Sequence, residues 1–243
     1  MLKQRPRAPA PALNEPRTVA EVLGTALKLY VSYAVLFIGL SMAVVVPYEL
    51  IVLAVAHASP LGQEHTSAGK ALILSLIQIA LVGPLVSALQ VRAVQMLGEH
   101  EQPRFIEVIG RSLPMLPVVV AAEIIAGLGI GIGLILLIIP GVILALRWAV
   151  VAQVAAIEKT DWPGALKRSA QLTSRNYLRI LAILVCVSIV NLTLTNVGAA
   201  AIGTRTRPAE VAAGIAIAVL QSSFQALTIA VLYFDLRARE QRP

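Results

Sequence analysis

The sequence of 243 residues contains one cysteine, Cys186, and three histidines. A lone cysteine cannot build a disulfide framework or a metal-binding cluster within one chain. The sequence also lacks the HExxH and GxSxG motifs and any paired metal-binding motif. Its polar connections are too short for a soluble catalytic domain, which needs on the order of 100 residues. We therefore expect a protein without enzymatic activity, with no catalytic residue, no metal site and no cofactor.

Charged residues are also scarce, because they make up 14% of the chain whereas hydrophobic residues make up 58%. These fractions lie well outside the range of soluble domains. The hydrophobic residues gather in runs close to the roughly 20 residues that an α-helix needs to cross about 30 Å of hydrocarbon. The runs are Tyr33–His57, Ala71–Val91, Leu113–Ile139, Gly141–Ile157, Ile180–Gly203 and Val211–Phe234. This pattern predicts an all-α polytopic membrane bundle of six transmembrane helices.

The basic residues lie mainly in the segments on one side of these runs, and the chain has a net charge of +7. The other side holds only Lys70, Arg205 and Arg207. The positive-inside rule then places both termini in the cytoplasm, in agreement with an even number of spans. Because the basic residues are spread over four separate segments, we expect no nucleic-acid binding. Anionic phospholipid on the cytoplasmic face is the partner that this arrangement favours.

A short amphipathic segment precedes a pair of hydrophobic runs three times along the chain. The segments are Thr18–Val31, Pro103–Leu113 and Trp162–Tyr177. Their spacing of apolar residues predicts short helices that lie in the headgroup plane on the cytoplasmic face, and their order suggests a threefold internal repeat. They could instead be plain extensions of the spans. We expect residues 1–16 to form a flexible cytoplasmic tail, residues 17–239 one transmembrane domain and residues 240–243 a second cytoplasmic tail.

The middle and the end of the chain carry its most specific motifs. They are Ile138-Ile139-Pro140-Gly141-Val142, Leu146-Arg147-Trp148, Glu158, Ala165-Leu166-Lys167-Arg168-Ser169 with Leu172, and Tyr233-Phe234-Asp235-Leu236-Arg237-Ala238-Arg239. This combination resembles a bacterial family of polytopic proteins related to the membrane domain of glycerophosphoryl diester phosphodiesterases. The resemblance implies a protein of the bacterial cytoplasmic (inner) membrane. The soluble catalytic barrel of the phosphodiesterases has no counterpart here, so hydrolase activity does not carry over.

Pro140 and Gly141 predict a tight hairpin between the third and fourth runs, since proline lacks a backbone donor and glycine tolerates unusual dihedral angles. Four glycines precede this turn, at positions 127, 129, 131 and 133. Gly127 and Gly131 have the small-xxx-small spacing of close helix packing. We expect these glycines to serve the approach of neighbouring helices.

Ionisable residues inside a span cost about 2.5 to 3.5 kcal/mol each at mid-helix. Glu123 and Arg147 lie at similar depths on the third and fourth runs. We therefore predict that they form an intramembrane ion pair, which favours a role in fixing helix register over a role in transport.

Glu49 follows Pro47 by two residues and has no obvious basic partner at its depth. It could line a polar cavity with Gln78, Gln90 or the Asn191 and Asn196 pair, where it would be a candidate proton site. Alternatively, it could extend to the outer interface, which is the reading that we favour.

Two groups of charged residues are expected at the cytoplasmic boundary. Asp235, beside Arg237 and Arg239, should bond a basic residue or the end of an interfacial helix and so close the bundle. Lys167, Arg168 and Arg175 are candidate ligands for a phospholipid headgroup, although ordinary topology determination explains them equally well.

Three functions remain open. The first is a non-enzymatic membrane protein that binds or organises phospholipid, and the alternative is a transporter of a small solute or lipid. An intramembrane hydrolase is the weakest, since no catalytic motif is present. A polar cavity would favour transport, whereas a packed bundle with lipid in cytoplasmic grooves would favour the first function.

Overall fold

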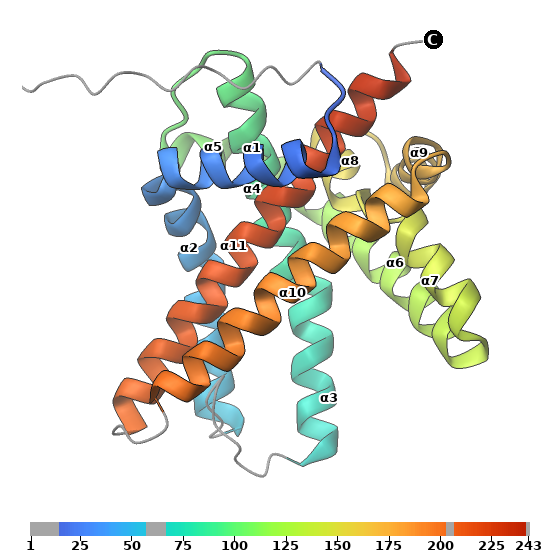
Figure 1. Cartoon of the computed structure of the whole chain (residues 1–243). Coiled ribbons are helices and arrows are strands. Elements are labelled where there is room, and N and C mark those ends of the chain that lie inside the picture. The colour runs from blue at the N-terminus through green and yellow to red at the C-terminus, as the bar shows by residue number, and fades with distance from the viewer. Residues whose placement is uncertain (1–14, 57–66, 203–206, 242–243) are drawn as a thin grey trace, which may run out of the picture.

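The computed structural model describes residues 15–56, 67–202 and 207–241, and every regular element in these ranges is helical (Figure 1). The first half of the chain contains α1 (Val19–Ser32), α2 (Ala34–Ala56), α3 (Ala68–Ile77), the π-helical turn η1 (Gln78–Val82), α4 (Gly83–Gly98) and α5 (Phe105–Ser112). The second half contains the 3₁₀ turn η2 (Leu113–Met115), α6 (Leu116–Leu136), α7 (Ile138–Arg147), α8 (Val151–Ile157), α9 (Trp162–Thr173), α10 (Tyr177–Ile202) and α11 (Arg207–Glu240). The prediction of an all-α bundle is confirmed.

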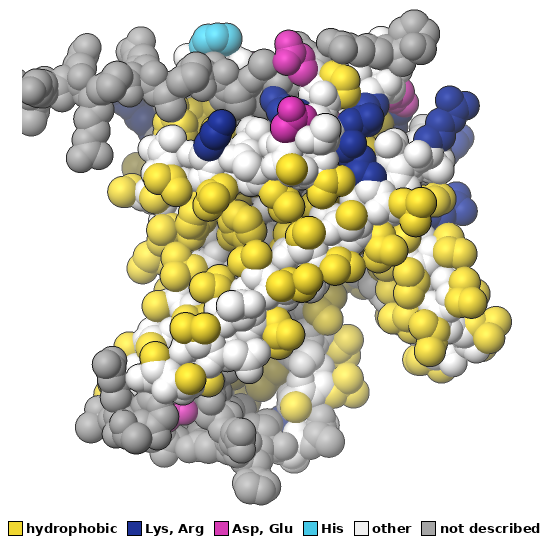
Figure 2. All heavy atoms as spheres, viewed as in Figure 1, with side chains coloured by type: hydrophobic (Ala, Val, Ile, Leu, Met, Phe, Trp, Pro, Cys, Tyr) yellow, Lys and Arg dark blue, Asp and Glu magenta, His cyan; other side chains and the backbone are white. Residues whose placement is uncertain are grey.

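Six stretches of helix are long and apolar enough to cross a membrane. They are Ala34–Val55, Gly69–Gly98, Phe105–Leu136, Ile138–Ile157, Tyr177–Ala201 and Pro208–Glu240. Large hydrophobic side chains lie exposed on the outside of these helices, and Figure 2 shows many of them across the face in view. Such a surface is compatible with lipid rather than water. The chain is therefore a multi-pass membrane protein.

Helices α1, α5 and α9 lie at the end of the bundle where the Lys and Arg side chains gather, which we call the basic end (Figures 1 and 2). A long apolar helix and then a second one follow each of them, so the order of elements repeats three times. In the second repeat, α5 continues through η2 into α6 and forms the start of the span Phe105–Leu136. Local sequence explains where α1 begins. The hydroxyl of Thr18 accepts from the backbone N–H of Glu21, whose carboxylate accepts from the backbone N–H of Thr18. This capping box lowers the pKa of Glu21 and holds the chain in the turn that starts the helix.

Helix α1 has apolar residues on two faces. Val22, Ala26 and Leu29 are buried in the bundle, whereas Leu27 and Val31 are 53% and 70% exposed. A helix at an aqueous surface would keep such large side chains inside. Their exposure fits a helix that lies at the boundary between headgroups and hydrocarbon.

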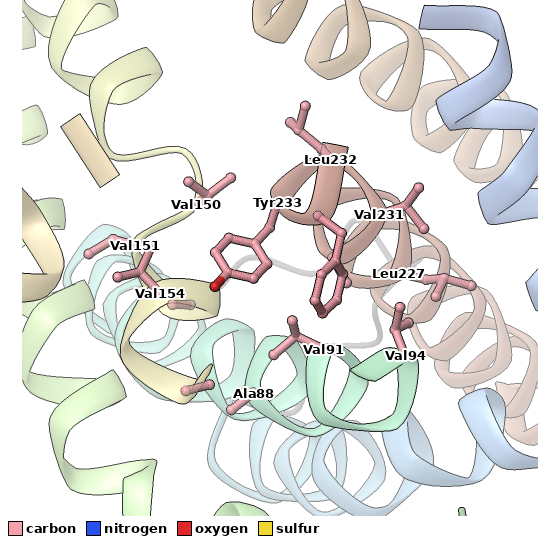
Figure 3. Close-up of a cluster of buried hydrophobic side chains, with 14 of the residues drawn as sticks. Ala88, Val91, Val94, Val150, Val151, Val154, Leu227, Val231, Leu232 and Tyr233 are labelled. Atoms are coloured by element: carbon pink, nitrogen blue, oxygen red, sulfur yellow. The ribbon is translucent and has the colours of Figure 1, made fainter. Parts of the chain in front are cut away.

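The centre of the fold is a contact of small side chains between α4, α8 and α11. Figure 3 shows Tyr233 of α11 between α4 and α8, with its hydroxyl toward α8. The other labelled residues of this buried cluster are mostly valine, namely Ala88, Val91, Val94, Val150, Val151, Val154, Leu227, Val231 and Leu232. Short side chains let the three backbones approach closely, which provides dispersion energy that lipid cannot replace.

The hairpin of α6 and α7 uses a different pair of glycines from the one expected. A Cβ added at Gly129 would meet the Trp148 ring, and one at Gly133 would lie 3.0 Å from the Cα of Gly141. Gly127 and Gly131 have open space in the corresponding position. The expected close approach is therefore confirmed at Gly129 and Gly133, which have the same four-residue spacing, but not at Gly127 and Gly131.

The turn of this hairpin is also displaced from the Pro140–Gly141 position. Leu137 is extended, with φ −158° and ψ 132°, and α7 begins at Ile138. Pro140 lies in the first turn of α7, where its missing N–H leaves no hydrogen bond unmade.

Several of the spans contain a proline or an irregular turn. Pro47 lies within α2, the π-helical turn η1 joins α3 to α4, and residues 148–150 interrupt the helix between α7 and α8. Pro84 has no N–H to donate, which favours the wider π-helical pattern in the turn before it. At the third irregularity, the carbonyl of Arg147 instead accepts from the hydroxyls of Ser169 (2.9 Å) and Thr173 (3.1 Å).

Candidate functional site

A cavity of about 400 Å³ lies among the spans. Its lining comes from α2, η1, α4, α6, α8, α10 and α11, together with Ala149. Ten lining residues are polar, namely Tyr48, Glu49, Gln78, Ser87, Glu123, Gln153, Asn191, Gln221, Ser222 and Gln225. Polar side chains in a span are expensive unless they have a partner or a function. Their convergence on one cavity makes it the candidate functional site.

The irregular turns of the spans place several of these polar residues. Tyr48 and Glu49 directly follow Pro47, and Gln78 begins the π-helical turn. The hydroxyl of Tyr48 donates to the carbonyl of Leu74 on α3 (2.8 Å), which fixes the tyrosine ring against the neighbouring span. π-helical turns and prolines within membrane helices are common at functional sites because they direct side chains and backbone groups toward a cavity.

Amide side chains on α10 and α11 form an ordered wall of the cavity. The Gln221 amide nitrogen donates to the Asn191 carbonyl (2.6 Å) and to the Thr195 hydroxyl (2.8 Å). The Asn191 amide nitrogen donates to Oε1 of Gln225 (3.1 Å), whereas Oδ1 of Asn191 is buried and has no partner within the described residues. The amide nitrogens of Asn191 and Gln221 thus donate within the protein, whereas Oδ1 of Asn191 remains an unused acceptor.

Two carboxylates, Glu49 and Glu123, line the cavity from α2 and α6. Glu49 is 7% exposed and forms no hydrogen bond or ion pair with another described residue. Glu123 accepts from the backbone N–H of Ala152 in the first turn of α8, where that donor has no partner within the helix. Among the described residues, the lining includes no Lys, Arg or His. The charged groups of the cavity are therefore all acidic.

The structure does not bring Glu123 and Arg147 together. Arg147 ends α7, is exposed, and forms no ion pair within the described ranges. The prediction treated the fourth span as one continuous helix. The interruption after Arg147 brings the start of α8 to Glu123 instead.

Glu49 is buried in the cavity lining and does not extend to the outer interface. The favoured prediction, an interfacial position, was therefore wrong, and the alternative position in a polar cavity is the one observed. Gln78 and Asn191 share the cavity with it, as that reading expected. Gln90 does not, because it is fully buried and donates to the hydroxyls of Ser41 (2.8 Å) and Ser223 (3.0 Å). Asn196 donates to the Leu192 carbonyl of its own helix and is exposed.

Asp235 is the centre of a charged cluster at the basic end. It is fully buried and accepts from the backbone N–H of Arg17 (2.5 Å), just before α1. The Nε atoms of Arg179 on α10 and Arg239 on α11 lie 3.2 and 3.1 Å from its Oδ2. Arg239 also donates to the Arg17 carbonyl (2.6 Å). One carboxylate thus joins the start of α1 to α10 and α11. The sequence predicted that Asp235 would bond a basic residue or the end of an interfacial helix, and the structure shows both kinds of partner.

Arg168 belongs to a second charged cluster. It lies 2.9 Å from the Glu158 carboxylate and forms a two-pronged contact with Glu240, while Tyr233 donates to Glu158 (3.0 Å). The hydrogen bond with Glu240 is the main cause of a raised pKa for the Arg168 guanidinium. Arg168 is therefore committed to protein carboxylates and is poorly suited to hold a headgroup.

Lys167 and Arg175 are exposed and form no ion pair within the described part of the chain. Arg175 borders a second cavity of about 460 Å³, whereas Lys167 does not. This cavity lies between the end of α9, the residues that link it to α10, and α11, and its lining also includes Asn176, Arg239 and Glu240. Arg237 is partly buried and forms no ion pair with a described residue.

Most of the residues that line the cavity were not predicted from the sequence. Gln221, Ser222 and Gln225 occupy adjacent turns of α11, and Gln153 lies on the short helix α8. Their polarity within apolar runs was the available signal. A periodic polar stripe on one span does not, however, indicate which other spans face it.

No family model, curated protein or solved structure matches this chain. The resemblance to the phosphodiesterase membrane domain stays a prediction, so the functional argument depends on the geometry of the site.

We predict that Asp235→Asn lowers the free energy of unfolding by about 3 kcal/mol, because it leaves two nearby guanidinium groups without a buried counter-charge. The matched control is Glu107→Gln, which removes one carboxylate from an exposed contact with Arg111 and should cost at most about 1 kcal/mol. Unfolding in mixed micelles, followed by circular dichroism during titration with dodecyl sulfate, measures both. Equal losses would contradict the central role of Asp235.

Proposed function

We propose that this protein is a non-enzymatic membrane transporter whose substrate, a small polar solute, binds in the cavity lined by Glu49 and Glu123. The observation that supports the proposal is the convergence of ten polar side chains on one cavity of about 400 Å³ among membrane spans. This volume lies within the roughly 300 to 1,000 Å³ typical of small-molecule sites. A bundle that needed only to be stable would have filled this space with apolar side chains.

We propose that the basic end faces the cytoplasm of a bacterial cell and that both termini lie there. The clustering of Lys and Arg at this end supports the orientation through the positive-inside rule. The charge distribution in the sequence supports the same orientation.

The packing around the cavity is consistent with access from alternate sides. Toward the basic end, the Gln90 cluster and the small-residue core around Tyr233 close the space between α4, α8 and α11. Toward the opposite end, the α6–α7 hairpin diverges from α10 and α11 (Figure 1). Movement of this hairpin about the interruption at residues 148–150 would change the side from which the cavity is reached, as in transporters whose helix bundles rock against each other.

Cysteine accessibility tests this proposal without knowledge of the substrate. We expect Ser87→Cys, in a Cys186→Ser background, to react with a charged, membrane-impermeant thiosulfonate from both sides of the membrane, because Ser87 lines the cavity. Intact cells and inverted membrane vesicles present the two sides.

The matched control is Ser41→Cys, since Ser41 is fully buried outside the cavity and should not react. Reaction of Ser87→Cys from one side only would contradict transport, and reaction from neither side would contradict a hydrated cavity.

A phospholipid site at the basic end is a second candidate function, supported by the cavity beside Arg175. A guanidinium group without an internal partner suits a phosphate diester, which it binds through two parallel hydrogen bonds. We expect Arg175→Ala to lose co-purified phosphatidylglycerol in native mass spectrometry. Lys167→Ala is the control, because Lys167 is exposed on α9 but does not border the cavity. Equal retention of phosphatidylglycerol by both variants would contradict a lipid site at Arg175 and leave topology determination as the role of these residues.

A further inference from the structure

The cavity among the spans is lined by two carboxyl groups and, within the described residues, by no basic side chain. Its ionisable lining consists of Glu49, Glu123 and Tyr48, and Glu49 has no hydrogen-bonding or ionic partner within the described ranges. An ionised carboxylate inside a membrane needs a counter-charge or hydrogen bonds to offset its lost hydration. A cationic ligand would supply that counter-charge.

The unpartnered oxygen of Asn191 favours a ligand with an N–H donor. The side-chain donors of Asn191 and Gln221 are used on other protein atoms, while Oδ1 of Asn191 is buried and unpartnered. An ammonium group offers up to three donors and no acceptor, which matches such a wall. A quaternary ammonium has no donor and depends on several aromatic faces, whereas Tyr48 is the only aromatic residue recorded in this lining.

The two carboxylates come from helices on opposite sides of the bundle. Glu49 belongs to α2 and Glu123 to α6, and Figure 1 shows other helices between α2 and α6. Apolar side chains, including Val45, Val82 and Ile229, complete the lining. A ligand with two cationic ends and a methylene middle would satisfy both carboxylates and cover this apolar surface.

We infer that the cavity binds a linear alkyl diamine, with one ammonium group at Glu49 and the other at Glu123. This inference rests on the proposed function and names its class of substrate. An anion would be repelled by both carboxylates, and a neutral solute would leave them without a counter-charge. Among the described residues there is no group of three or more His, Cys, Asp or Glu that could hold a metal ion, so the organic cation is the better match.

Calorimetric binding to the protein in nanodiscs tests the inference. The probes are linear diamines of four, six and eight carbons, the monoamine and the diol of each length, and sodium chloride. We expect at least one diamine to bind about tenfold more tightly than its monoamine, as a second charge-assisted contact would provide, and the diol not to bind.

The variants Glu49→Gln and Glu123→Gln test the two ends separately. Each should reduce the affinity for the diamine about tenfold, to that of the monoamine, because one cationic contact remains. Glutamine retains an acceptor oxygen for the Ala152 N–H, so the start of α8 stays capped. Glu107→Gln, at an exposed ion pair outside the cavity, should bind the diamine like the wild type.

Three results would overturn the inference: equal binding of the diol and the diamine, unchanged diamine binding in both cavity variants, or binding of none of the amines. If no amine binds but Ser87→Cys reacts from both sides, the transport proposal stands and the diamine inference fails. If the diamine binds as expected but Ser87→Cys reacts from one side only, the ligand site stands and transport fails.

Discussion

The absence of water from the hydrocarbon core is the constraint on which this structure depends, because polar groups there must find partners within the protein. Most do so in ways that also join the helices. Ser169 and Thr173 satisfy the carbonyl of Arg147, and Arg92 donates to the Ala156 carbonyl at the end of α8 (2.7 Å). At the basic end, the buried carboxylate of Asp235 likewise joins the segment before α1 to α10 and α11. Glu49 is the opposite case, and its position marks the cavity.

The two ends of the bundle differ in how they are held. At the basic end, the ion pairs of Asp235 and Arg168 secure α9, α10 and α11 over a core of small side chains. Toward the other end, the α6–α7 hairpin separates from α10 and α11, and its outer residues, such as Ile135, are exposed. A transporter needs a firm region and a movable one, and movable elements come from regions with few stabilising contacts. Rotation of the α6–α7 hairpin about residues 148–150, just before α8, would therefore change the side of the membrane from which a solute reaches the cavity.

The sequence predicted the spans, the amphipathic helices and their order because these depend on local composition and periodicity. It failed where a regular helix was interrupted. The pairing of Glu123 with Arg147 assumed a continuous fourth span. For Glu49, the cavity with Gln78 and Asn191 was one of two alternatives from the sequence, and the other alternative was preferred. The preference for Gly127 and Gly131 failed for a related reason, because Gly129 accommodates Trp148 from beyond the end of α7. Residues that meet in the cavity come from spans whose mutual rotation is set by packing, which single-helix patterns do not encode.

Hydroxyl-radical footprinting of the protein in nanodiscs tests most directly whether the centre of the bundle contains a hydrated cavity. Tyr48 and Tyr233 provide a matched comparison, since both are buried tyrosines but only Tyr48 lines the cavity. We expect radicals formed from water in the cavity to oxidise Tyr48 and to leave Tyr233 unmodified. Protection of Tyr48 equal to that of Tyr233 would contradict the account, because the polar side chains would then enclose a dry space.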